Sequence, residues 1–263
     1  HADVLVVIHD LGLEYERQGR FDDAARLLEQ CCDVRAQTLG PDSLGYATTL
    51  LSLVIVYDNQ GRREEAQRLR EQAMPVLRKH LPVGHPSLVH EELNLAVSLI
   101  HQRRYEHARL LAQAALDNTR KNFPANDPRI ARCLGILEVA YRQSGKLDKA
   151  REVLEQAKTI YEEAYGTDHP STAGTLADLA RLQILAGHDD QAAPLLDRAI
   201  HVYDRADESP GQRSRLYSQR ARLHWRQQRH AEALLDLKEA MLLAEQQRSL
   251  ASGAEREGAD AFA

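Results

Sequence analysis

The chain has 263 residues, of which 43% are hydrophobic and 28% are charged, and its formal net charge at pH 7 is −5. This composition suits a protein with a large core, and the negative charge offers no general attraction for nucleic acid or for an anionic membrane. No apolar run approaches the length needed to span a bilayer, and the N-terminus lacks a basic, apolar targeting pattern.

The three cysteines argue against a disulfide framework and favour a reducing, cytoplasmic location. Cys31 and Cys32 are adjacent, so on a helix their side chains point about 100° apart, which disfavours a bond between them. Cys31 is expected to be a buried thiol rather than a redox group.

A landmark residue recurs along the chain every 42 residues, and the last interval is 41. The landmarks are Gly19, Gly61, Arg103, Gly145, Gly187 and Gln228. An alanine always stands five residues after the landmark, and another small residue stands twelve residues after it. A constant period of this kind predicts a stack of similar structural repeats rather than two globular domains.

Each repeat is expected to be a pair of helices. In the first repeat, Ile8, Leu11 and Tyr15 lie three and four residues apart, which places them on one face of a helix. The landmark ends this helix, because glycine readily adopts the left-handed conformation that closes a helix. A second helix follows at once and opens with acidic residues such as Asp22, which interact favourably with the helix dipole.

The links between repeats also share a pattern. Pro86, Pro128 and Pro170 are expected in the first turn of the following helix, where proline loses no hydrogen bond. Asp127 is expected to cap the helix that starts at Pro128. The predicted repeats are residues 4–41, 42–84, 85–127, 128–169, 170–210 and 211–248, and residues 249–263 are expected to form a flexible tail or linker.

The first turn carries Tyr15, Gly19, Phe21 and Ala24, and two links read Gly-Pro-Asp at 40–42 and Gly-Thr-Asp-His-Pro at 166–170. These features resemble the 42-residue tetratricopeptide repeats of the kinesin light chain type, over about residues 4 to 248. The resemblance implies an all-α fold, a right-handed superhelical solenoid of six helix-turn-helix repeats.

The sequence departs from this pattern in places. Arg103 and Gln228 replace the turn glycine, Asp189 replaces the aromatic residue that follows it, and Arg220 replaces a packing leucine. Repeats three, five and six are therefore expected to be less regular than the others.

The resemblance implies that the first helices line a concave groove and the second helices form its back. The groove positions lie 13, 10, 6, 3 and 2 residues before each landmark. In the middle repeats these positions give an apolar floor of Leu51, Ile55, Leu93, Val97 and Ile100. In the last three repeats they give arginines without an acidic residue, at Arg132, Arg142, Arg181, Arg215, Arg222 and Arg226.

The groove is therefore expected to bind a protein or peptide with apolar anchors and an acidic stretch, since arginine recognises carboxylates in paired geometry. The alternative is that the arginines pair with acidic neighbours on adjacent helices. Trp225, the only tryptophan, is the candidate anchor. The alternative for this residue is that it fills a gap between the last two helices.

We find no pattern that predicts catalysis, a metal site or a cofactor. His90 begins a His-Glu-Glu-Leu-Asn segment that lacks the second histidine of a zinc-protease helix, and His224 and His230 have no cysteine or acidic neighbour that completes a metal set. Cys133 could be combined with a distant histidine, but among 12 histidines such a pair carries no signal.

The leading expectation is a non-catalytic protein-interaction scaffold. The alternative is a regulatory or sensor arm of a larger enzyme or signalling protein. Nucleic-acid binding at the arginine-rich end is disfavoured by the overall charge.

The N-terminus is expected to make a contact of its own. The chain lacks an initiator Met and begins inside a helical pattern, so we expect a fragment of a larger protein, or a mature chain after signal cleavage. Residues 4–8 are all apolar, and no helix precedes them. Because a solenoid needs polar caps, this uncapped end is expected to dock on a missing domain or on a second copy of the chain.

Overall fold

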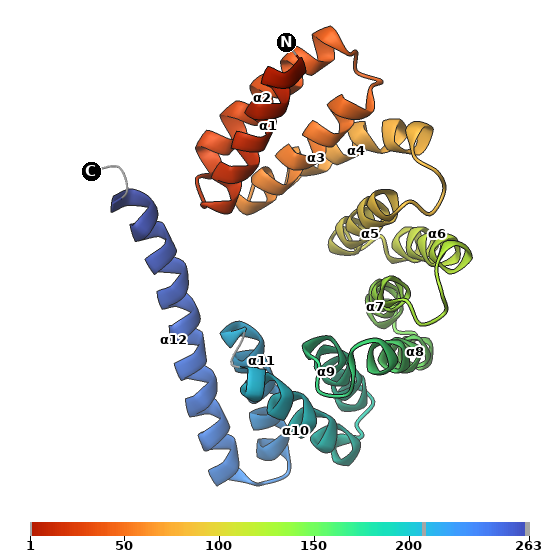
Figure 1. Cartoon of the computed structure of the whole chain (residues 1–263). Coiled ribbons are helices and arrows are strands. Elements are labelled where there is room, and N and C mark those ends of the chain that lie inside the picture. Colours follow the sequence, from red (N-terminus) through yellow and green to blue (C-terminus); the bar gives the residue numbers. More distant parts are fainter. Residues whose placement is uncertain (1, 207–208, 261–263) are drawn as a thin grey trace. The chain divides into compact units, whose positions relative to one another are not determined.

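The computed structural model describes residues 2–206 and 209–260, and these form twelve α-helices (Figure 1). The first helices of the repeats are α1 (Ala2–Arg17), α3 (Leu44–Asn59), α5 (Pro86–His101), α7 (Pro128–Gln143), α9 (Pro170–Leu185) and α11 (Pro210–Arg226). The second helices are α2 (Phe21–Thr38), α4 (Arg63–His80), α6 (Tyr105–Asn122), α8 (Leu147–Tyr165), α10 (Asp189–Ala206) and α12 (His230–Asp260). The predicted all-α fold of six helix-turn-helix repeats is confirmed.

Every repeat turns at its landmark residue in the left-handed conformation. The φ angle is 75° at Gly19 and 79° at Gly187, and it stays positive at Arg103 (59°) and Gln228 (62°). In each turn, the amide of the residue after the landmark donates to the carbonyl five residues earlier, which satisfies the end of the first helix. The backbone therefore keeps one turn geometry even where the sequence lacks glycine.

The links between repeats have the predicted helix starts and cap. Pro86, Pro128 and Pro170 are each the first residue of a helix. Asp127 Oδ1 accepts a hydrogen bond from the amide of Arg129 at 2.9 Å, which confirms the predicted cap.

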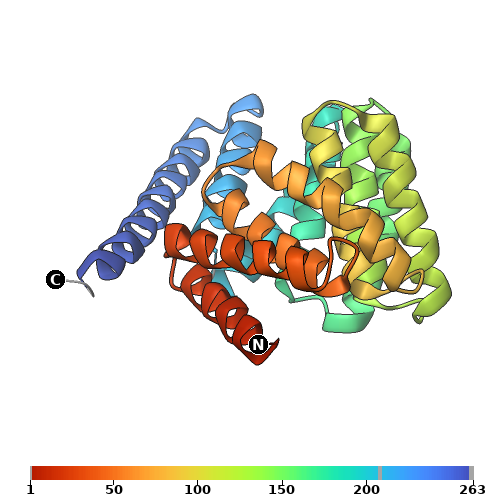
Figure 2. The ribbon, with the colours of Figure 1, turned by 90° about the horizontal axis from the view of Figure 1, so that it is seen from above.

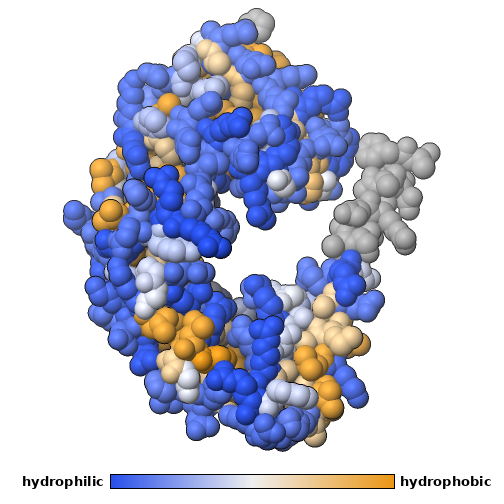
Figure 3. Space-filling view, turned by 180° about the vertical axis from the view of Figure 1, so that it is seen from behind, coloured by the Kyte–Doolittle hydropathy of each residue, from blue (hydrophilic) through white to orange (hydrophobic). Residues whose placement is uncertain are grey.

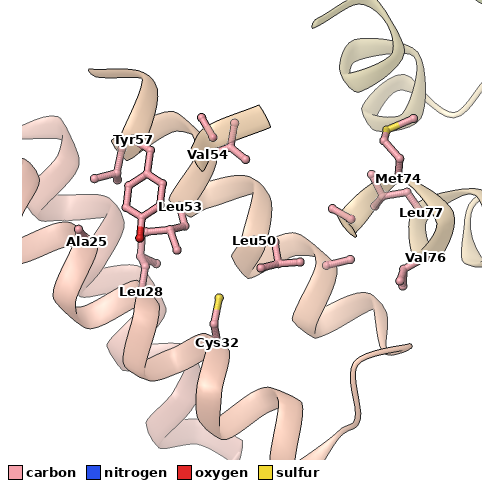
Figure 4. Close-up of a cluster of buried hydrophobic side chains, with 14 of the residues drawn as sticks. Ala25, Leu28, Cys32, Leu50, Leu53, Val54, Tyr57, Met74, Val76 and Leu77 are labelled. Carbon is pink, nitrogen blue, oxygen red and sulfur yellow. The ribbon is translucent and has the colours of Figure 1, made fainter. Parts of the chain in front are cut away.

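The described residues divide into two compact units, an N-terminal unit of residues 2–98 and 253–260 and a C-terminal unit of residues 99–206 and 209–252. In the N-terminal unit, Leu28 and Cys32 of α2 pack with Leu50 and Tyr57 of α3, and the same core continues to Leu77 of α4 (Figure 4). Hydrophobic residues at helical spacing thus hold successive repeats together, because each second helix packs on the next first helix.

The C-terminal unit repeats this packing. Leu176 and Ala180 of α9, Leu196 and Ile200 of α10, and Leu223 of α11 belong to one core. In this unit α7 packs against α8, and α9 packs against α10 (Figures 1 and 2). The recurring alanine five residues after the landmark is fully buried in every repeat, which lets the helices approach closely.

All three cysteines are buried and free, as expected for Cys31. Burial raises the pKa of the Cys32 thiol to about 12. The segment expected to form a tail begins inside α12, which continues to Asp260; residues 261–263 lie outside the described part of the chain.

Candidate partner-binding surface

Carboxylates accompany the arginines on the first helices of the C-terminal unit. On α7, Arg142 Nε donates to Glu138 Oε1 at 2.6 Å, and Glu138 is only 1% exposed. On α9, Arg181 Nη1 lies 2.9 Å from Asp178 Oδ1. Arg142 therefore compensates a buried charge, and its guanidinium is already engaged within the protein.

The electrostatic environment of Asp178 shows that three neighbouring first helices contribute to one cluster. Burial raises the pKa of Asp178, while Arg181, Arg142 and Arg215 act in the opposite direction. Burial also raises the pKa of Glu138, and Arg142 opposes this rise most strongly. We call Glu138, Arg142, Asp178, Arg181 and Arg215 the arginine cluster. The cluster contains three arginines and two carboxylates, so it keeps a positive excess.

Two arginines beyond this cluster are exposed without an ion pair. Neither Arg132 of α7 nor Arg222 of α11 has an ion pair with any residue that the structure describes. Arg226 is different, because its Nε lies 3.1 Å from Asp189 Oδ2. Asp189 stands two residues after its landmark, where the first and third repeats have Phe21 and Tyr105, and its contact with Arg226 gives that departure a structural role.

Trp225 is 55% exposed at the end of α11. Its ring meets the ring of His230, the first residue of α12, edge-on, with centroids 4.4 Å apart and planes at 60°. The tryptophan thus contacts the next helix at one edge and presents most of its surface to solvent.

The predicted apolar floor is smaller than the sequence indicated. In the N-terminal unit, Ile55 is 51% exposed, Leu51 and Val97 are half-buried, and Leu93 is 2% exposed. In the C-terminal unit, Ile100 is 8% exposed. Leu93 and Ile100 are therefore core residues and are not available to a partner, which corrects their assignment to the groove surface.

The two carboxylates lie outside the five groove positions of each helix, so the sequence prediction did not include them. Glu138 lies four residues before Arg142, and Asp178 lies three residues before Arg181. Both spacings place the two side chains on the same helix face. Helix spacing between opposite charges was therefore the signal that could have identified these pairs.

Two kinds of potentially reactive group can be assessed in the described part of the chain: sets of metal-ligating side chains and the thiol of Cys133. No group of three or more metal-ligating side chains lies together among these residues. Cys133 is buried 3.7 Å from the Thr119 hydroxyl, and burial raises the pKa of its thiol, which makes it a poor nucleophile. Among the described helices, none combines the length and the apolar character that a membrane crossing requires.

Comparison with known proteins supports the repeat assignment. A family model of the tetratricopeptide repeat matches residues 3–79, 90–163 and 139–205, and a second model of this repeat matches residues 214–234. A search of curated proteins gives no match.

Three solved structures illustrate the similarity. One is a Podosopora anserina protein described as a kinesin light chain, which consists of nearly identical TPR-like repeats. It has a TM-score of 0.66 at 26% identity, over 80% of this chain and 99% of that chain. BtubC (BKLC) from P. vanneervenii has a TM-score of 0.68 at 16% identity, over 89% and 92% of the two chains. The apo form of RapI has a TM-score of 0.69 at 13% identity, over 93% and 99%.

BtubC and RapI, the two structures of lower sequence identity, share the fold of this chain. Because the family model covers most of the sequence and the structure consists of six helical hairpins with one turn geometry, the chain belongs to the tetratricopeptide repeat family.

Proposed function

We propose that the protein is a non-catalytic scaffold that binds a protein or peptide segment along the exposed face of its first helices. The observation that carries this proposal is the set of exposed arginines on α7 and α11. Arg132 and Arg222 have no carboxylate partner in the described part of the chain, and Arg215 is an exposed member of the positive arginine cluster. Tetratricopeptide repeats generally mediate protein–protein interaction, and an exposed arginine fork suits a carboxylate.

The internal ion pairs divide the arginines into two groups. Arg142 and Arg226 are held by Glu138 and Asp189, so a partner gains less from them. Arg132, Arg215 and Arg222 are exposed. Arg181 is engaged with Asp178, but it belongs to the arginine cluster, in which arginines outnumber carboxylates, and it is grouped with these three. The partner segment is therefore expected to place its acidic residues beside this second group of four arginines.

Apolar anchoring in the C-terminal unit is assigned to Trp225, and the N-terminal unit separately offers Ile55 with the half-buried Leu51. Trp225 and Ile55 are each more than half exposed. Tryptophan and arginine are enriched among residues that dominate binding energy at interfaces. The partner is accordingly a segment with both acidic and apolar residues, and the cellular setting consistent with three free thiols is a reducing compartment such as the cytoplasm.

The test uses two pools of fluorescein-labelled peptides of about twelve residues, each with apolar residues at variable positions. One pool carries several Asp and Glu residues, and the other carries Asn and Gln in their place. Fluorescence anisotropy is expected to show binding of the acidic pool only, and the affinity is expected to fall as salt is raised from about 50 to about 300 mM. Equal binding of the two pools, or binding of neither, would contradict the proposal.

Matched variants locate the binding surface. Arg222→Glu is expected to weaken binding of the acidic pool by about tenfold, since it replaces an attraction by a repulsion. Asp178→Asn is expected to strengthen binding several-fold, because it removes the carboxylate that neutralises Arg181. Arg205→Glu makes the same charge reversal on the second helix α10, where the side chain is 67% exposed, and should leave binding unchanged. A loss of binding in Arg205→Glu equal to that in Arg222→Glu would show that only net charge matters.

A further inference from the structure

The first and the last helix expose apolar faces. On α1, Val4, Val7 and Leu11 are 57%, 64% and 42% exposed. On α12, the exposed fractions of Leu234, Leu237 and Met241 are 53%, 40% and 71%. Apolar surface is visible over α12 in Figure 3. We call these two sets the α1 face and the α12 face.

The α1 face occupies positions that other first helices bury. Val7 lies twelve residues before its landmark. The residues at this position in the later repeats are at most 8% exposed: Thr49, Glu91, Cys133, Thr175 and Leu216. They are covered by the second helix of the preceding repeat, as shown by Arg35 Nη1, which donates to Thr49 Oγ1 at 2.6 Å.

The α12 face occupies positions that other second helices bury. Leu237 lies nine residues after its landmark, and Met241 lies thirteen residues after it. The equivalents of Leu237 are at most 7% exposed: Leu28, Arg70, Ala112, Leu154 and Leu196. The equivalents of Met241 in four repeats are also at most 7% exposed: Cys32, Met74, Leu116 and Ile200. Within residues 2–206 and 209–260, no first helix covers these positions of α12 as one does in the earlier repeats.

The internal repeat contacts define the register in which the two faces fit each other. Arg70, nine residues after a landmark, pairs with Glu91, twelve residues before the next one, at 3.3 Å. By this register, Val7 lies opposite Leu237 and the neighbouring Met241. Arg151 Nη2, six residues after a landmark, donates to Gln183 Oε1, four residues before the next one, at 3.4 Å. By that register, Leu234 lies opposite Tyr15.

We propose that these faces bind each other between two copies of the chain, so that α1 of one copy packs on α12 of the next. The contact continues the internal repeat interface across the two molecules and pairs apolar residues with apolar residues on both sides. Exposed apolar helix faces of this kind favour association. Because the two surfaces differ, the contact is heterologous and produces open chains or closed rings.

The first test is the concentration dependence of the mass in solution, measured by sedimentation equilibrium. Between about 10 and about 500 µM, the weight-average mass of the wild type is expected to rise from 29.6 kDa to more than twice that value. A mass that stays at 29.6 kDa over the whole range would overturn the proposal and assign the faces to other segments.

The second test uses one variant for each face. Val7→Glu removes the α1 face and Met241→Glu removes the α12 face, so each variant alone is expected to remain monomeric. An equimolar mixture of the two is expected to form a one-to-one dimer, because each variant retains the face that the other has lost. Self-association of Met241→Glu to the wild-type extent, or a mixture that stays monomeric, would contradict a contact between unlike faces.

The control variant is Leu110→Glu on α6. Leu110 is 58% exposed and lies seven residues after its landmark, outside both faces. It introduces the same charge into an exposed apolar site and is expected to associate like the wild type. Far-UV circular dichroism of every variant establishes that the helices are intact, and a loss of association in Leu110→Glu would show that the effect is not specific to the two faces.

Discussion

Arg220 of α11 and Asp236 of α12 form a two-pronged ion pair, with Nη2–Oδ1 and Nε–Oδ2 distances of 2.7 and 3.0 Å. Arg220 occupies the position eight residues before the landmark, where the five earlier repeats have leucine. Asp236 occupies the position eight residues after it, where they have leucine or valine. Two apolar positions of the repeat have therefore been replaced together by a charge pair.

This ion pair predicts that a single substitution lowers the stability of the protein and that a second substitution restores it. Arg220→Leu leaves the carboxylate of Asp236, which is 5% exposed, without its main partner, and should lower the free energy of unfolding by about 3 kcal/mol. The double variant Arg220→Leu/Asp236→Leu restores the apolar pair and should be at least as stable as the wild type. Urea denaturation measures both values, and a double variant less stable than Arg220→Leu would contradict the account.

The turn geometry predicts a gain in stability. Arg103 and Gln228 hold φ angles of 59° and 62°, which are costly for a residue with a Cβ. Arg103→Gly should therefore raise the free energy of unfolding by about 0.5 kcal/mol, since the relief of strain exceeds the added entropy of the unfolded chain. Gly145→Ala makes the opposite change at φ 76° and should lower it by about 1 kcal/mol. Thermal denaturation of the two variants should shift the midpoint in opposite directions.

Asp178 predicts a pH dependence of stability. Its pKa is raised in the folded protein by burial, so the folded state binds this proton more tightly than the unfolded state does. The contribution of Asp178 to stability therefore falls as pH rises from the unfolded pKa of about 3.9 through the folded pKa. In Asp178→Asn this fall should be absent. Urea denaturation at several pH values, compared between wild type and variant, measures the difference, and parallel profiles would show that Asp178 does not titrate in this way.

The thiols should be unreactive in the folded protein. Cys31, Cys32 and Cys133 are all buried, and burial raises the pKa of Cys32 to about 12. At pH 8 a disulfide reagent should therefore label none of them until the chain is unfolded by urea, when it should label all three. Fast labelling of the folded protein would show that these helices open readily.

The repeat could be predicted from the sequence because its signals are local. Glycine at the landmark indicates a left-handed turn, and an alanine five residues later indicates close helix packing; both are visible in the printed sequence. The turns at Arg103 and Gln228 followed from the constant period, although neither residue favours this conformation.

The surface could be predicted only in part. Leu93 and Ile100 are buried, whereas Leu51, at the same repeat position as Leu93, is only half-buried, so the packing around each individual helix decides which of these positions are exposed. The pairing of Arg142 with Glu138 depends on rotamers and burial, which the choice of five groove positions did not include.

The central claim, that the arginines of the first helices bind an acidic partner segment, is tested most directly by NMR. The Nε–Hε signals of ¹⁵N-arginine-labelled protein would be followed during titration with the acidic peptide pool, with assignments from single Arg→Lys variants. The account predicts shifts for Arg132, Arg181, Arg215 and Arg222 and for the Trp225 indole, with the signal of Arg205 on α10 unchanged. Shifts confined to Arg205 and other second-helix arginines would contradict it.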